Sequence, residues 1–153
     1  MKNKLKSILV TLLLLLLLLS VLAIFNAMFI VGPTAKYDSN INTKITNIET
    51  KYKVSNVYRH VFRYSVFIGE TKEDYIFFDD NETKLLTVNK TEVDVNKAKL
   101  IALDKGFSKA CSIQIGYGYD NAAYIIEENE HLLVLDIKSY KELYYKGGGK
   151  YDK

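Results

Sequence analysis

The sequence predicts an α+β protein in which an N-terminal transmembrane helix precedes two small units, each a helix packed on an antiparallel sheet. Three observations support this fold class. A long apolar run opens the chain. Short segments in which apolar and polar residues alternate indicate strands. One amphipathic segment with cap residues at both ends indicates a helix between two groups of strands.

The apolar run extends from Ser7 to Val31 and contains eight consecutive leucines, Leu12–Leu19. At ~1.5 Å per residue, a helix over this run is longer than the ~30 Å hydrocarbon core of a bilayer. The apolar region of a cleaved signal peptide spans only ~7–15 residues. We therefore expect residues 7–31 to form a retained transmembrane helix in contact with the lipid bilayer, with a cleaved secretory signal as the alternative.

A basic flank, residues 1–6, precedes the apolar run and carries Lys2, Lys4 and Lys6 without any acidic residue. This bias places the flank in the cytoplasm and the C-terminal domain outside it. The whole chain has 21 Lys+Arg and 18 Asp+Glu, so removal of these three lysines leaves 18 of each. Because the exterior part is near neutral, no nucleic-acid partner is expected.

Cys111 is the only cysteine, so the exterior part has no internal disulfide and depends on its core alone. We expect Cys111 to be a small buried residue at the start of a strand, with a nucleophile or an intermolecular bridge as the alternative. The chain is rich in Lys, Asn, Ile, Leu and Tyr. This bias is typical of AT-rich coding, as in low-GC Gram-positive bacteria.

Gly32-Pro33 is expected to break the membrane helix, because proline lacks an amide hydrogen and clashes with the preceding turn. Beyond it, residues 36–53 place Ile41, Ile45 and Ile48 on one stripe. This spacing predicts a short juxtamembrane helix, with a solvated stalk as the alternative.

The first unit, residues 36–90, continues with a meander of three strands. Its first strand is predicted over residues 54–68, because apolar side chains of one parity recur along that segment. Residues 75–78 and 85–88 are predicted to form the second and third strands, each after a polar turn.

The second unit, residues 91–146, opens with the clearest helix of the chain. Asp94 can cap its N-terminus, Val95–Leu103 carry an apolar stripe, and Gly106 can adopt the left-handed conformation that ends a helix. Residues 147–153 are predicted to be a flexible tail. Four further strands are predicted near residues 113–119, 122–127, 131–137 and 140–145.

This order of elements resembles the TseB-like (YpmB-type) cell-wall elongation regulators, whose exterior part holds two PepSY-like, cystatin-like units. The stretch most similar to that family is Val93–Phe107. The residues that fit the positions of a PepSY-type helix are Asp94, Ala98, Ile101, Gly106 and Phe107. The resemblance spans residues 1–146 and lies mostly in spacing. Residues 36–53 depart from it, because they are rich in Thr and Asn where the family has Ala, Lys and Glu.

The resemblance implies a non-enzymatic, single-pass membrane protein on the outer face of a Gram-positive cell. Its implied role is to regulate cell-wall elongation through contact with a penicillin-binding transpeptidase. A different function remains open, namely a PepSY-type inhibitor or chaperone of an extracytoplasmic peptidase.

The residue inventory offers no catalytic, cofactor-binding or metal-binding site. The two histidines, His60 and His131, have no second histidine or cysteine at a metal-ligand interval. The acidic segment Asp79–Glu82 lacks the glycine and the spaced acid of a calcium loop, so we expect a solvated turn there. The sequence thus predicts neither an enzyme nor a protein with a cofactor or small-molecule ligand.

Tyrosine is frequent, with 12 residues in the chain. A tyrosine combines a large apolar face with a polar tip, which suits protein interfaces. The alternative is that these rings cover small cores while their hydroxyls reach water. The candidates for a partner-facing patch are Tyr117, Tyr119, Tyr144 and Tyr145.

Overall fold

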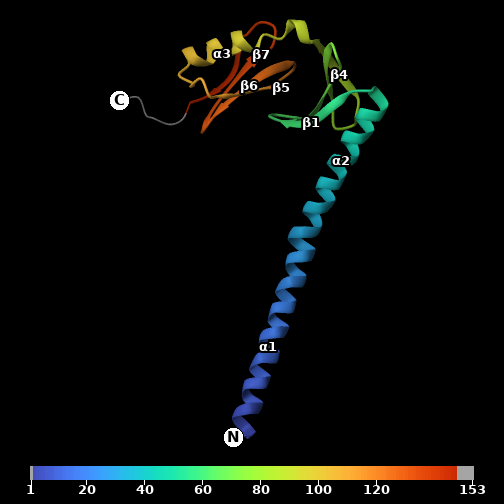
Figure 1. Cartoon of the computed structure of the whole chain (residues 1–153), viewed down its shortest axis with the longest axis vertical. Helices are drawn as coiled ribbons and strands as arrows, with labels where there is room; N and C mark the ends of the chain where they lie inside the picture. Colours follow the sequence, from blue (N-terminus) through green and yellow to red (C-terminus); the bar gives the residue numbers. More distant parts are fainter. Residues whose placement is uncertain (1, 148–153) are drawn as a thin grey trace. The chain divides into compact units, whose positions relative to one another are not determined.

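The computed structural model describes the backbone from residue 2 to residue 147 and the side chains of residues 6–31 and 33–147 (Figure 1). The chain divides into two compact parts, an N-terminal part (Met1–Thr43) and a C-terminal part (Lys44–Lys153). Except for Gly147, the flexible tail predicted over residues 147–153 lies outside the described residues.

The N-terminal part is helical. Helix α1 (Lys2–Asn26) continues through a π-helical turn, η1 (Ala27–Val31), into α2 (Gly32–Tyr52), whose end belongs to the C-terminal part. The leucines Leu12–Leu19 each expose between 55% and 62% of their surface, all around α1. Among the described residues, this helix alone is long and apolar enough to cross a membrane, and a signal sequence would meet the same criterion.

The predicted break at Gly32-Pro33 is wrong, because the helix continues through it. Pro33 has no N–H to donate to the carbonyl of Phe29, as an α-helix would require. The π-helical turn η1 ends directly before Gly32 and shifts the hydrogen-bond ladder by one residue. The missing donor thus falls where the ladder is already altered, and α2 begins instead of a loop.

The first sheet is antiparallel and its strands follow one another in chain order. The end of α2 packs on one of its faces: Ile48 is fully buried, and the Tyr52 ring lies 4.6 Å from that of Phe78. Ile48 and Tyr52 are four residues apart, so they share one side of the helix. The strands are β1 (Ser55–Val61), β2 (Ser65–Glu70), β3 (Asp74–Phe78) and β4 (Lys84–Asn89).

The single strand predicted over residues 54–68 is wrong, because this segment forms the β1–β2 hairpin. Val61 pairs with Ser65, and the chain turns over residues 62–64. Tyr58 then pairs with Ile68 and His60 with Val66. The two residues of each pair are both even-numbered, so even-numbered residues face the same side of the sheet before and after the turn. The alternation in the sequence therefore continues through a turn that it cannot reveal.

Helix α3 (Val95–Asp104) follows a short 3-10 turn, η2 (Lys90–Glu92), and has the predicted caps. The Lys97 N–H donates to Oδ1 of Asp94 at 3.0 Å. Gly106 has a φ of 91°, and the Phe107 N–H donates to the Ala102 carbonyl at 3.1 Å. Both helix ends are therefore satisfied by residues adjacent in the sequence.

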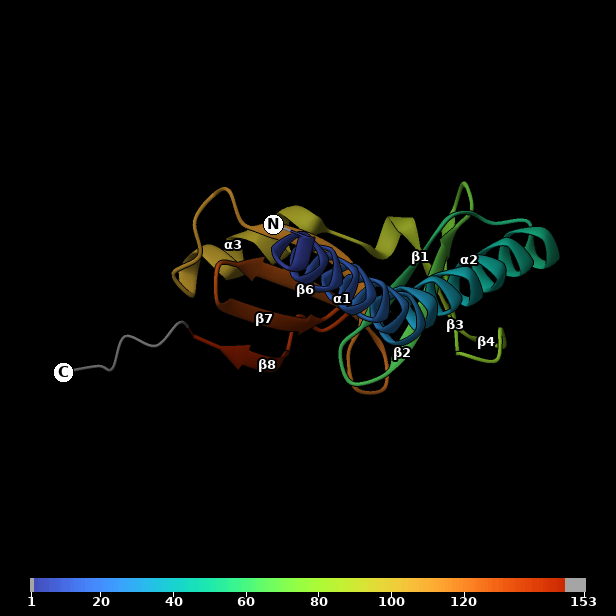
Figure 2. The same cartoon turned by 90° about the horizontal axis from the view of Figure 1, so that it is seen from below.

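The second sheet is also antiparallel, with its strands in chain order, and α3 lies along one of its faces (Figure 2). The four strands predicted for this half are confirmed, with ends shifted by a few residues. They are β5 (Ser112–Tyr117), β6 (Ala122–Glu128), β7 (His131–Asp136) and β8 (Glu142–Lys146).

One hydrophobic core joins the two sheets and α3. Each sheet and the helix contribute buried side chains to the same cluster, so the two sheets stabilise each other through shared apolar contacts. Members of this shared core are Val66, Ile68, Phe77 and Val88 from the first sheet, Ala98 and Ala102 from α3, and Ile115, Tyr124, Ile126, Leu133 and Leu135 from the second sheet.

Candidate functional site

The four tyrosines predicted to form a partner-facing patch lie in three different surroundings. Tyr119 and Tyr144 both pack edge-on against Phe62, with ring centroids 5.7 Å and 5.6 Å away. The guanidinium of Arg63 lies 5.4 Å from the Tyr119 ring. These contacts connect the β1–β2 turn with the second sheet.

The other two tyrosines lie apart from this group. Tyr117 is half-buried, with its ring centroid 6.2 Å from that of Phe77 in the shared core. Tyr145 is exposed and lies 6.5 Å from Phe107, while Lys105 Nζ is 5.7 Å from its ring centroid. Tyr144 and Tyr145 are neighbours on β8, so their side chains point to opposite faces of the sheet.

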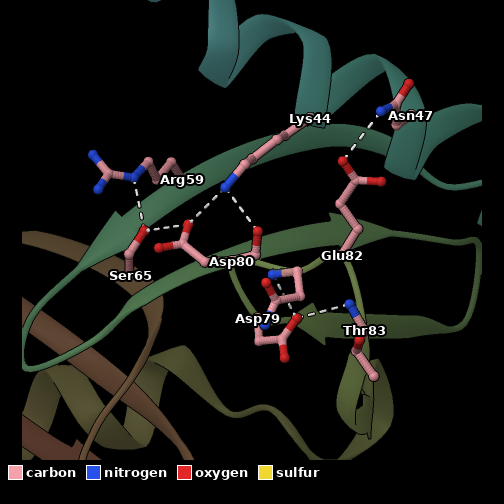
Figure 3. Close-up of polar contacts among 9 residues, drawn as sticks. Lys44, Asn47, Arg59, Ser65, Asp79, Asp80, Glu82 and Thr83 are labelled. Carbon is pink, nitrogen blue, oxygen red and sulfur yellow. Dashed lines mark hydrogen bonds and ion pairs between the residues drawn. The ribbon is translucent and has the colours of Figure 1, made fainter. Parts of the chain in front are cut away.

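The acidic segment Asp79–Glu82 forms the turn between β3 and β4 (Figure 3). Oδ1 of Asp79 accepts hydrogen bonds from the N–H groups of Asn81 and Thr83, at 2.9 Å and 2.8 Å. A carboxylate that accepts bonds from its own turn fixes the local backbone. In the described part of the chain, no group of three His, Cys, Asp or Glu residues is placed to hold a metal ion.

The same turn receives polar side chains from the end of α2, as Figure 3 shows. Lys44 Nζ donates to the Asp80 carbonyl at 2.7 Å and lies 3.3 Å from Oδ1 of that residue. The Asn47 amide donates to Oε1 of Glu82 at 3.1 Å. The turn predicted to be merely solvated thus uses its oxygens to bind the helix end.

His60 lies where the first sheet meets the second. Its side chain is half-buried and lies against Gly116 of β5, and Nε2 has no hydrogen-bond partner among the described residues. Burial lowers the pKa of His60, and the nearby Glu127 carboxylate and the Tyr117 backbone partly oppose that effect. His131 is also half-buried, with its ring 5.8 Å from Phe107.

An open cleft of about 590 Å³ lies at the edge of β5, between the two sheets. Its apolar wall combines aromatic and branched side chains, and its rim carries charged groups. The cleft thus offers both apolar contacts and polar groups to a ligand. The lining residues are Tyr58, Arg59, Glu70, Tyr75, Val95, Ile113, Gln114 and Ile115.

Tyr58 lines this cleft and bonds to another of its lining residues through its hydroxyl. It donates a hydrogen bond to the Ile115 carbonyl at 2.7 Å and so joins β1 to β5. Burial raises the pKa of Tyr58 well above its usual range, and Tyr75 and Glu70 add to this shift. The hydroxyl therefore keeps its proton and remains a donor across the neutral pH range.

An ion pair lies at the rim. Lys90 Nζ is 2.8 Å from Oε2 of Glu70 and 4.9 Å from the centroid of the Tyr75 ring. The hydrogen bond to Glu70 raises the pKa of Lys90. Because the pair is open to water, its contribution to stability is small, but it gives the rim both a donor and an acceptor.

The sequence did not reveal this cleft, although one signal was present. Tyr58 and His60 occupy the apolar parity of their strand and carry polar tips. Polar groups on a buried face need partners, and the Tyr58 hydroxyl finds one on β5. A search for polar tips on apolar faces would have pointed to these two residues.

Comparisons with known proteins assign no family to this arrangement. No protein-family model, curated protein or solved structure matches the chain.

Proposed function

We propose that this chain is a single-pass membrane protein whose C-terminal part is a non-enzymatic interaction module outside the cytoplasm. One observation carries the proposal, namely the outward-facing leucines of α1, which have no protein neighbour to cover them. An apolar surface of this kind on all sides of a helix suits lipid. The three lysines before it favour a cytoplasmic N-terminus.

The proposed role is regulation of cell-wall synthesis through contact with a penicillin-binding transpeptidase. It rests on the resemblance to the TseB-like regulators, carried by Val93–Phe107 and by the order of elements. Supporting observations are the Asp94 and Gly106 caps of α3. Anchoring both proteins in one membrane raises their effective concentration, so a weak contact suffices.

A second candidate function is inhibition or chaperoning of an extracytoplasmic peptidase, in which two PepSY-like units would act on the enzyme. The cleft at the edge of β5 favours it, because an unpaired strand edge can bind an extended segment of another protein.

The anchor is tested by membrane fractionation with alkaline extraction, followed by mass spectrometry of the mature N-terminus. We expect the intact chain in the membrane pellet and its exterior part sensitive to protease added to whole cells. A shortened chain in the culture medium, starting beyond Val31, would refute the anchor.

The partner is tested by photo-crosslinking in intact cells. A photoreactive residue at Gln114, in the cleft, is compared with one at the exposed Thr87 on β4. A transpeptidase recovered from position 114 supports the first role, and a peptidase recovered there supports the second. Recovery of neither class, with the chain present in the membrane, would reject both.

A further inference from the structure

The backbone of β5 has hydrogen-bonding groups that point away from β6 at every second residue. The Gly118 N–H donates to the Asn121 carbonyl at 2.9 Å, and this bond sets the alternation along the β5–β6 hairpin. By the same alternation, the backbone N–H and carbonyl groups of Tyr117, Ile115 and Ile113 face away from β6. Since β5 is the first strand of its sheet, these groups lie on an open edge.

Side chains of β1 occupy two positions of that edge. The Tyr58 hydroxyl donates to the Ile115 carbonyl, and the His60 ring lies against Gly116, where an added Cβ would be 2.8 Å from Nε2. Tyr58 and His60 are two residues apart on β1, and both lie against β5. Side chains from one face of β1 therefore cover part of the β5 edge, although the two strands belong to different sheets and form no ladder.

Ile113 is the next outward-facing position along β5. Among residues 2–147, none is hydrogen-bonded to its outward N–H or carbonyl group. Ile113 lines the cleft, whose apolar wall includes Tyr75 and the exposed Val95. The cleft thus places an unpaired backbone edge beside an apolar wall.

We propose that the cleft binds an extended segment of a partner polypeptide, which adds to β5 as a short strand at Ile113. An extended backbone is the occupant that offers N–H and carbonyl groups at the spacing of a strand edge. The Tyr58–Ile115 bond stops this strand at one end, so pairing is confined to the segment around Ile113. An apolar side chain of the occupant packs on Tyr75 and Val95.

This inference rests on the proposed function as an interaction module and names the kind of surface that the partner presents. Its test needs neither the partner's identity nor its location. The full chain in lipid nanodiscs is used to select binders from a displayed library of short random peptides. Empty nanodiscs remove lipid binders, and the enriched sequences are synthesised.

Two matched comparisons then examine strand addition. Ile113→Pro removes the outward N–H without removing a bond to β6, whereas Ile113→Val keeps that N–H. We expect the peptide to bind Ile113→Pro about tenfold more weakly and Ile113→Val as it binds the native chain. On the peptide, N-methylation of one set of alternate residues should abolish binding, while methylation of the other set should not.

Hydrogen exchange on the native chain provides a measurement that requires no variant. Bound peptide should slow exchange of the Ile113 N–H and leave the β4 and β8 edges unchanged. The proposal is overturned if no peptide is enriched, if both methylation sets act alike, or if protection appears on another edge. A negative result in the membrane-fractionation or crosslinking test, by contrast, would refute the proposed cellular role but would not affect the peptide-binding result.

Discussion

The backbone N–H of Asp94 donates a hydrogen bond to the hydroxyl of Tyr124, at 2.8 Å. Tyr124 is fully buried on β6, and Asp94 caps α3. One buried hydroxyl therefore holds the start of the helix to the middle of the second sheet. This bond links the local signal that begins α3 to the shared core.

Tyr124→Phe removes this hydroxyl and keeps the ring. The Asp94 N–H then loses its acceptor, so we expect the free energy of unfolding to fall by about 1–3 kcal/mol. Urea unfolding followed by circular dichroism measures this change. Tyr64→Phe, at an exposed tyrosine of the β1–β2 turn, is the matched control and should change little. Equal effects of both variants would show that the Asp94 bond is not a stabilising contact.

Gly116→Ala should destabilise the protein through close packing. A Cβ at residue 116 would lie 2.3 Å from Cγ1 of Ile125 and 2.8 Å from Nε2 of His60. Accommodating it requires shifts of packed side chains, with an expected cost of about 1–3 kcal/mol. The midpoint of thermal unfolding reports the loss.

The control for this substitution is Gly147→Ala, where the nearest atom to the new Cβ would be the end of the Tyr145 side chain at 3.2 Å. That side chain is exposed and can move, so stability should be unchanged. A thermal midpoint for Gly116→Ala equal to that of the native chain would contradict the packing at β5.

The fold follows from the sequence where its signals are local. Asp94 and Gly106 lie within the helix they cap, and apolar alternation shows directly in β5 and β6. The β1–β2 turn, residues 62–64, has no glycine, proline or asparagine to mark it, and its pairing preserves the alternation. A period-two pattern alone therefore reads as one long strand.

The cleft depends on contacts that no local pattern contains. Tyr58 and Ile115 are 57 residues apart and meet only once both sheets have formed around the shared core. Whether a strand lies at an edge depends on the order of strands in space, which alternation does not encode. The sequence could thus predict the strands that build the site but not the open edge itself.

His60 should make stability depend on pH. Because burial lowers its pKa in the folded state, the folded protein prefers the neutral imidazole more than the unfolded chain does. Its contribution is fully present above the unfolded pKa of about 6.5 and is lost as the pH falls through the lower folded value. The free energy of unfolding should therefore decrease as the pH falls below about 6.5.

His60→Gln removes this titration, so the slope of unfolding free energy against pH should become flatter in that range. His131→Gln, at the other histidine, is the comparison. The two histidine variants are measured in the same urea series at each pH. An unchanged slope in His60→Gln would assign the dependence to other groups.

Ile48→Ala tests whether the end of α2 is part of the folded C-terminal part, which begins at Lys44. Ile48 is fully buried, so truncation should lower the free energy of unfolding by about 2–5 kcal/mol. Thr50→Ala, two residues away on the exposed side, is the control. If the polar contacts of Lys44 and Asn47 alone held the helix end, Ile48→Ala would match this control. A large loss confined to Ile48→Ala would instead show that the buried contact with the first sheet dominates, because exposed ion pairs contribute little.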